Sequence, residues 1–302
     1  MIEETFRVAK ETGLVSENTA AVEKSQPIED SVTPEAQQIE KAAPAPSGKE
    51  KTPFIARVKS FTRRGRELNP GIQRTWDAYA GQYVIDVPRA EGYTTVADGF
   101  RLDLEATFGR VAPLVVEIGP GNGEQIVAYA KAHPEMDFLA FEVYRQGIGK
   151  TIARAVAAGV TNLRLVEADA AQALPIMLAD GCASEVWVFF PDPWRKARHH
   201  KRRLVSPAFA LEVARLLKDD GVWRMATDWQ NYAWQMRDVL EGCDQFLNPY
   251  LGERPDPEEP EPTRGGYAPR FEGRVKTHFE NRGDRQGRES YDIVGIRRPR
   301  EN

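Results

Sequence analysis

From residue 114 onward, short apolar segments alternate with segments of helical periodicity, and no other feature restricts the possible folds as much. The apolar runs that predict strands lie at 114–118, 138–141, 163–166, 186–190, 222–226 and 291–296. The helical patterns between them lie at 124–132, 147–158 and 207–217. Strands and helices that alternate over these lengths predict an α/β fold with a doubly wound, mostly parallel sheet.

The first part of the chain has a different composition. Residues 1–52 contain one aromatic residue, Phe6, and Ala/Pro-rich segments that bury too little surface to offset the entropy of ordering. We therefore expect a disordered tail at 1–52, with room for a short helix near 35–41, and one folded domain over 53–302. Within that domain, residues 248–270 are rich in Pro, Gly and acidic residues and predict a loop.

Composition also excludes several classes of protein. Hydrophobic residues make up 41% and charged residues 28% of the chain, which is typical of globular proteins, and no apolar run reaches the roughly 20 residues that span a bilayer. The acidic N-terminus is not a secretory signal, so we expect a cytoplasmic protein without a membrane partner. Cys182 and Cys243 form no metal or redox motif, and we expect no metal site and no obligate protein partner.

The net charge of −4 conceals an uneven distribution. Residues 1–50 hold 10 acidic and 5 basic side chains, and the rest of the chain holds 36 basic and 35 acidic ones. Five of those acids gather at 253–261, so other parts of the domain are more basic than the total suggests.

A glycine-rich turn follows the strand predicted at 114–118. Gly119, Gly121 and Gly123 allow the backbone to turn tightly and to approach a ligand closely. A dinucleotide-binding turn would space its glycines as G-x-G-x-x-G, whereas here the third glycine comes one residue early. Glu117, just before the turn, would repel a pyrophosphate but suits the ammonium and sulfonium groups of S-adenosylmethionine. The turn therefore favours S-adenosylmethionine over a nicotinamide cofactor.

Two further acids follow neighbouring predicted strands. Glu142 ends the strand at 138–141, where α/β folds place a ribose-binding carboxylate, and Asp169 follows the strand at 163–166. Ligands of open α/β sheets bind at the carboxyl ends of the strands. We expect both acids to face the same cofactor as Glu117.

A stiff loop follows the fourth predicted strand. Pro191 and Pro193 restrict the backbone on both sides of Asp192, which suits a catalytic side chain but also an ordinary rigid turn. Directly after this loop, residues 195–203 carry six Lys or Arg, two His and no acid. A second basic cluster lies upstream and comprises Arg57, Lys59, Arg63, Arg64, Arg66 and Arg74. A basic run beside the predicted cofactor pocket, with a second basic cluster elsewhere in the chain, indicates a nucleic-acid substrate held by its phosphates.

With these motifs in place, the sequence resembles the bacterial tRNA (guanine(46)-N7)-methyltransferases over roughly residues 54–298. The resemblance is carried by EIGPGNG at 117–123, FPDPWRKARHHKRR at 190–203, ATDW at 226–229 and THFENRG at 277–283, with SFTRRGR at 60–66 upstream. It implies the Rossmann-like fold of the S-adenosylmethionine-dependent methyltransferases. It also implies methyl transfer to N7 of the variable-loop guanine at position 46 of tRNA.

The resemblance implies roles for individual residues. The cofactor would be bound by Glu117, Gly119, Gly121, Gly123, Glu142, Asp169 and Asp192, of which Asp192 would also be catalytic. The substrate would be bound by Lys196, Asp228, Thr277, His278, Phe279 and Glu280. The RNA would be contacted by Arg198, His199, His200, Lys201, Arg202 and Arg203. Arg195 stands where the family commonly has His and His278 where it has Lys, and neither the stretch at 252–262 nor the tail follows the family.

Two other functions are compatible with these residues. One is a methyltransferase of the same fold that acts on a small molecule, because fold alone does not fix function. The other is a non-catalytic RNA-binding protein with a vestigial cofactor site. The basic run at 195–203 speaks against the first, and the four retained acids at the strand ends speak against the second.

Overall fold

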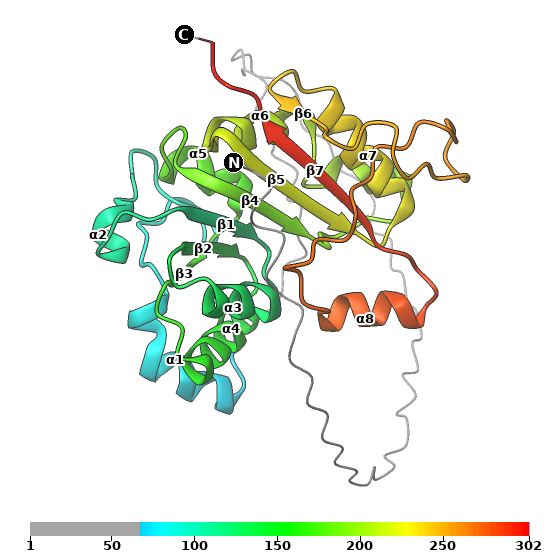
Figure 1. Cartoon of the computed structure of the whole chain (residues 1–302). Coiled ribbons are helices and arrows are strands. Elements are labelled where there is room, and N and C mark those ends of the chain that lie inside the picture. Colours follow the sequence, from blue (N-terminus) through cyan, green and yellow to red (C-terminus); the bar gives the residue numbers. More distant parts are fainter. Residues whose placement is uncertain (1–66, 302) are drawn as a thin grey trace, which may run out of the picture. The chain divides into compact units, whose positions relative to one another are not determined.

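Seven strands form a single sheet in the order β3-β2-β1-β4-β5-β7-β6 in the computed structural model, which describes residues 67–301 (Figure 1). The strands are β1 (Leu114–Ile118), β2 (Asp137–Glu142), β3 (Leu163–Glu167), β4 (Ala183–Phe189), β5 (Leu217–Thr227), β6 (Phe246–Leu247) and β7 (Tyr291–Arg297). The first five pair in parallel, and β7 runs antiparallel to both β5 and β6. The predicted doubly wound, mostly parallel sheet of Rossmann-like type is confirmed.

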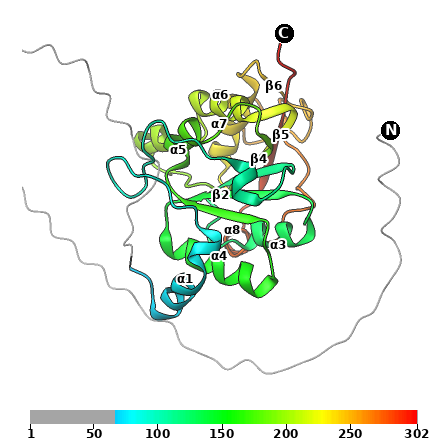
Figure 2. The same cartoon turned by 90° about the vertical axis from the view of Figure 1, so that its left-hand side faces the viewer.

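Helices cover both faces of this sheet. One face packs against α1 (Pro70–Tyr83), α3 (Glu124–Ala132) and α4 (Arg145–Ala158), and α1 lies beside α4 in both views (Figures 1 and 2). The other face packs against α5 (Ala170–Met177), α6 (Pro207–Leu216) and α7 (Gln230–Glu241). Three further helical elements complete the described chain: α2 (Leu104–Phe108), the 3-10 helix η1 (Ala197–Arg202) and α8 (His278–Arg285).

The continuous apolar runs follow from this double cover. Val115 belongs to the core beneath α3 and α4, and its neighbour Val116 belongs to the core beneath α5 and α6. Successive side chains of a strand point to opposite faces, so a strand covered on both sides is apolar at nearly every position. In β1 the exception is Glu117. The five residues of β1 are accordingly all buried.

Several elements differ from the sequence prediction. The strand expected at 222–226 is β5 and begins at Leu217, because the exposed Lys218 and Asp220 interrupt the apolar run without ending the strand. The short β6, the 3-10 helix η1 and the helices α1, α2, α5, α7 and α8 were not predicted. The start of α1 is nevertheless encoded locally, since Asn69 accepts a hydrogen bond from the backbone N–H of Ile72 at 2.9 Å and Pro70 occupies the first turn.

The third glycine of the turn after β1 has a packing role. Gly123 has a φ of 73°, and a Cβ built on it would lie 2.5 Å from the side chain of Thr151 in α4. Only glycine combines this backbone conformation with so close an approach. The turn therefore brings α3 and α4 together as well as shaping the strand end.

We expect Gly123→Ala to destabilise the fold by roughly 2–4 kcal/mol, about 1 from the left-handed backbone and the rest from crowding Thr151. Gly159→Ala is the matched control, because Gly159 has a φ of 68° but no atom within 4 Å of the added methyl group. Urea unfolding measures both. Equal losses in the two variants would show that contact with Thr151 does not constrain residue 123.

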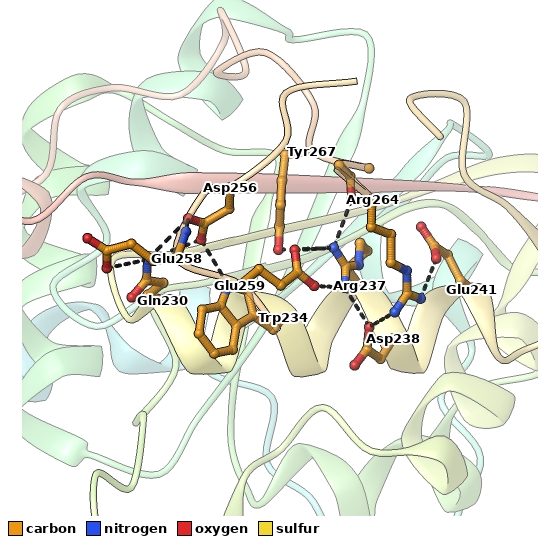
Figure 3. Close-up of polar contacts among 12 residues, drawn as sticks. Gln230, Trp234, Arg237, Asp238, Glu241, Asp256, Glu258, Glu259, Arg264 and Tyr267 are labelled. Atoms are coloured by element: carbon orange, nitrogen blue, oxygen red, sulfur yellow. Dashed lines mark hydrogen bonds and ion pairs between the residues drawn. The ribbon is translucent and has the colours of Figure 1, made fainter. Parts of the chain in front are cut away.

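The acidic segment at 248–270 contains no helix and none of the seven strands, and it is fixed against α7 by buried polar contacts. Arg237 of α7 is fully buried and donates to both carboxylate oxygens of Glu259 and, at 2.8 Å, to the carbonyl oxygen of Gly265 (Figure 3). Asp256 accepts from the indole N–H of Trp234 at 2.9 Å. Removing one partner of a buried ion pair costs about 3–5 kcal/mol, so the Arg237–Glu259 pair holds the loop in place, and the hydrogen bond to Asp256 adds to it.

The predictions for the tail at 1–52, the start of order near Pro53 and all the upstream basic residues except Arg74 lie outside the described residues. Among residues 67–301, no helix is long and apolar enough to cross a membrane.

Candidate active site

A pocket of about 280 Å³ lies at the carboxyl ends of β1, β2 and β4. Eight of the residues singled out in the sequence line it: Glu117, Gly119, Gly121, Glu142, Asp169, Asp192, Thr277 and Phe279. The strand order reverses between β1 and β4, and this is where open α/β sheets bind their ligands. Side chains separated by more than 150 residues thus share one cavity.

Glu117 is the most deeply buried acid of the pocket. It is 2% exposed, and its Oε2 has no hydrogen-bond partner among the described residues. Burial raises the pKa of Glu117 to about 8, and the nearby Glu142 carboxylate adds to the rise. A buried carboxylate without a partner is costly, so this oxygen is suited to receive a cationic group of a ligand.

Glu142 and Asp169 are held by backbone amides at the pocket wall. The Glu142 carboxylate accepts from the N–H groups of Gly121 at 3.0 Å and of Val143 and Tyr144 at 2.8 Å each. Asp169 caps α5 and accepts from the N–H of Ala171 at 3.2 Å. These bonds fix the direction of both carboxylates and tie the glycine turn to the end of β2.

The loop that carries Asp192 has a constrained backbone. Phe190 and Trp194, on either side of the Pro191-Asp192-Pro193 sequence, have φ values of 50° and 45°, which non-glycine residues rarely adopt. The backbone N–H of Phe190 donates to the carbonyl oxygen of Ala226 in β5 at 2.8 Å. Asp192 itself is exposed and lines the pocket.

Residues 270–280, which we call the strap, close one side of the pocket. Gln125 at the start of α3 donates to the carbonyl oxygen of Gly273 at 3.0 Å and accepts from the N–H of Val275 at 2.7 Å. Glu124 accepts from the N–H of His278 at 2.6 Å. The first turn of α3 therefore places Thr277 and Phe279 over the glycine turn.

The strap is also held by buried charges. Glu280 is 2% exposed, and its two oxygens accept from Arg270 at 3.0 Å each, with Arg274 at 3.3 Å from one of them. Arg274 also donates to both carboxylate oxygens of Asp292 in β7, at 2.6 and 2.9 Å. Glu280 does not line the pocket, and its carboxylate oxygens are bound by arginines of the protein.

Asp228, like Glu280, is bound by an arginine of the protein. It accepts from Arg288 at 2.8 Å, and a Cβ on Gly283 of α8 would lie 2.6 Å from its Oδ2. Asp228 does not line the pocket but packs closely against α8. Of the substrate residues implied by the resemblance, the pocket brings together Thr277 and Phe279 and leaves out Lys196, Asp228, His278 and Glu280.

The basic run forms a 3-10 helix next to the Asp192 loop. Arg198 and Lys201 are exposed, and Arg202 lies with its guanidinium carbon 4.9 Å from the ring centre of Trp194. Arg203 points inward instead. It is 5% exposed and donates to the carbonyl oxygen of Pro193 at 2.9 Å and to Asn231 at 2.6 Å, so its guanidinium belongs to the protein interior and is a poor candidate for an RNA contact.

Other lining residues were not singled out in the sequence. They are Tyr93, Gln125, Tyr144, Phe190 and Arg274 among others. A glutamine two residues after the last glycine of the turn and an arginine three residues before the THFE motif are the local signals that could have pointed to two of them. In the other direction, Gly123 does not line the pocket and acts through Thr151.

Comparison with known proteins agrees with this geometry. A family model described as "Putative methyltransferase" matches residues 111–293, which places the chain in the methyltransferase class. Two relatives are called tRNA (guanine-N(7)-)-methyltransferase. The one from Paenarthrobacter aurescens is 43% identical, and the match covers 80% of this chain and 92% of the relative. The one from Cutibacterium acnes is 44% identical, and the match covers 78% of this chain and 82% of the relative. A third, from Edwardsiella ictaluri, is 41% identical and covers 80% of this chain and 92% of its own length. This chain belongs to the tRNA (guanine-N7)-methyltransferase family.

The residues of the pocket fit S-adenosylmethionine, the methyl donor of this class. The partnerless Oε2 of Glu117 suits the ammonium group of the methionine part, and Glu142 and Asp169 offer acceptors to the ribose and base. Among the described residues, no group of three or more His, Cys, Asp or Glu could hold a metal ion. The individual cofactor contacts remain predictions.

We expect cofactor affinity to depend on pH through Glu117. Its pKa of about 8 means that Glu117 is protonated at neutral pH, and a cationic ligand must displace that proton. Affinity should therefore rise by up to about tenfold per pH unit toward pH 8 and fall above it, where the α-ammonium group of the ligand loses its own proton. Titration calorimetry in buffers of different ionisation enthalpy measures both the affinity and the released proton.

Glu117→Gln is the control, because it keeps the shape of the side chain and cannot ionise. A raised pKa stabilises the folded protein below the ordinary value of 4.5, and this contribution is lost as pH rises through about 8. The variant should bind the cofactor weakly at every pH and lack that loss of thermal stability. Wild-type affinity that stays constant across this range would contradict the assignment.

Proposed function

We propose that this protein transfers the methyl group of S-adenosylmethionine to N7 of a guanine in tRNA, at variable-loop position 46, and forms 7-methylguanosine. One arrangement supports the proposal most directly. The partnerless oxygen of Glu117 and the Asp192 loop line the same pocket, and the basic η1 follows that loop directly in the chain. The names of the relatives agree with this substrate, and we expect the enzyme to act on tRNA in the cytoplasm.

The chemistry of N7 determines what the protein must do. When bound, S-adenosylmethionine supplies an electrophilic methyl group on a sulfonium. N7 of neutral guanine has a free lone pair, so no proton has to be removed and the enzyme's task is in-line positioning. Positive charge develops on the purine, and a carboxylate close to the ring favours that change. Asp192 is the exposed carboxylate at the pocket that can take this role.

The entrance of the pocket offers contacts for a base. Phe279 is 53% exposed and lies 3.4 Å from the position that a Cβ on Gly121 would occupy, so an aromatic face is open beside the glycine turn. Bases that leave a stack commonly bind on aromatic side chains. We infer that the guanine stacks on Phe279 with its pairing edge toward Asp192 and Thr277.

Asp192→Asn should lower the single-turnover methylation rate by roughly 10²–10³-fold, the scale for losing one preorganised electrostatic group. The amide keeps the size of the side chain and removes the charge that favours the developing cation. Binding of tRNA should stay within about threefold, because phosphate contacts supply most of the affinity. Rapid-quench assays with labelled cofactor measure the rate.

Asp180→Asn is the matched control, since its side chain is 75% exposed and lies before β4, at the opposite end of the strand from Asp192. It should methylate at the wild-type rate. If Asp192→Asn does so too, the residue only shapes the loop.

The exposed cations of η1 should bind tRNA through counterion release. Replacing Arg198 and Lys201 by Ala should weaken binding and reduce the slope of log K against log salt by about 1 per lost phosphate contact. Lys131 and Lys218 are a control pair, because both are exposed and lie away from the pocket. Lys131 is at the end of α3, and Lys218 is near the start of β5, where the parallel strands have their amino ends. Filter binding over a salt series measures the slope. If both double variants keep the wild-type slope, η1 is only a solvated surface.

One assay separates the proposed function from its alternatives. Unmodified tRNA is incubated with the enzyme and labelled S-adenosylmethionine, and chain cleavage at 7-methylguanosine maps the product. A specific cleavage at position 46 supports the proposal. Cofactor binding without labelled tRNA would favour a small-molecule methyltransferase, and tRNA binding without cofactor binding would favour a vestigial site.

A further inference from the structure

Arg274 connects three parts of the active site. It belongs to the strap, lines the pocket, and its side chain has no exposed surface. Its guanidinium donates to Asp292 of β7 at 2.6 and 2.9 Å and lies 3.3 Å from Glu280 in the first turn of α8. The start of α8, which carries Phe279, is thereby tied to the sheet.

The same guanidinium contacts the Asp192 loop. Its central carbon lies 5.3 Å from the ring centre of Phe190 and 5.6 Å from that of Phe189, within the range of cation–π contacts. Phe190 is the left-handed residue that starts the turn toward Asp192. One buried cation therefore contacts both the segment that would hold the base and the loop that would hold the catalytic carboxylate.

We propose that Arg274 is a positioning residue for methyl transfer, whose guanidinium fixes the strap and the Asp192 loop in one relative geometry. This inference rests on the proposed function. The bonds of Arg274 are geometrically specific, because two donors engage the two oxygens of Asp292 while the same guanidinium lies within cation–π range of two rings. A lysine in its place keeps the charge but cannot make these contacts together.

Arg237 provides a matched control for burial and charge. Its side chain is also fully buried and donates to both oxygens of a carboxylate, that of Glu259, and it too faces an aromatic ring, that of Tyr267 at 5.4 Å (Figure 3). It lies in α7 and does not line the pocket. A purely structural role would make Arg274→Lys and Arg237→Lys behave alike.

The test measures melting temperature, cofactor affinity, tRNA affinity and single-turnover rate for both variants. We expect both to lose stability, and Arg274→Lys alone to lose about 10–100-fold in rate while both affinities stay within about threefold. Arg237→Lys should keep the wild-type rate within about twofold. Phe190→Leu keeps the ion pairs, and it should lower the rate several-fold and combine less than additively with Arg274→Lys.

The other possible results overturn either this proposal or the proposed function. Equal rates in Arg274→Lys and Arg237→Lys would overturn the proposal, as would a rate loss explained entirely by weaker cofactor binding, which would make Arg274 a cofactor ligand. If Arg274→Lys does not fold, Phe190→Leu decides, and a wild-type rate there refutes the coupling. A wild-type enzyme that labels no tRNA would refute the proposed function and not this inference alone.

Discussion

The parallel pairing of β1 with β4 determines where everything else in this molecule can lie. Glu117 pairs in register with Trp187, so the strand that ends in the glycine turn lies directly beside the strand that ends in the Asp192 loop. The connections that follow leave toward opposite sides of the sheet, because β2 and β3 extend it one way and β5 the other. The pocket lies between those connections, and two of its carboxylates, Glu117 and Asp192, come from the ends of the neighbouring strands β1 and β4.

The sequence predicted the fold and the cofactor side of the pocket more fully than the substrate side. The strands and the glycine turn have local signals, namely apolar runs and a fixed glycine spacing, and acids at strand ends must meet at one edge. No comparable local pattern around Glu280 or Asp228 indicates which groups their carboxylates bind. Whether a carboxylate faces a ligand or a protein cation depends on residues such as Arg270 and Arg288, at positions that only the tertiary fold brings close.

Arginine count is a poor guide to nucleic-acid contact in this chain. The run at 195–203 reads as a uniform basic surface, yet Arg203 is built into the interior, where it bonds to Pro193 and Asn231. Arg274 and Arg237 are buried in the same way, each beside carboxylates and an aromatic ring. The planar guanidinium serves here as an internal connector, because it can bind two oxygens in its plane and a ring on its face.

The left-handed backbone of Phe190 and Trp194 has a consequence for how this protein tolerates change. Each conformation disfavours an L-residue by about 1–2 kcal/mol relative to glycine, so both positions hold backbone strain. Glycine at either position would relieve the strain but remove a ring, since Phe190 packs on the core and contacts Arg274, and Trp194 contacts Arg202. The rings therefore keep the loop in a conformation that its backbone disfavours, and substitutions that relax the backbone also release the loop that aims Asp192.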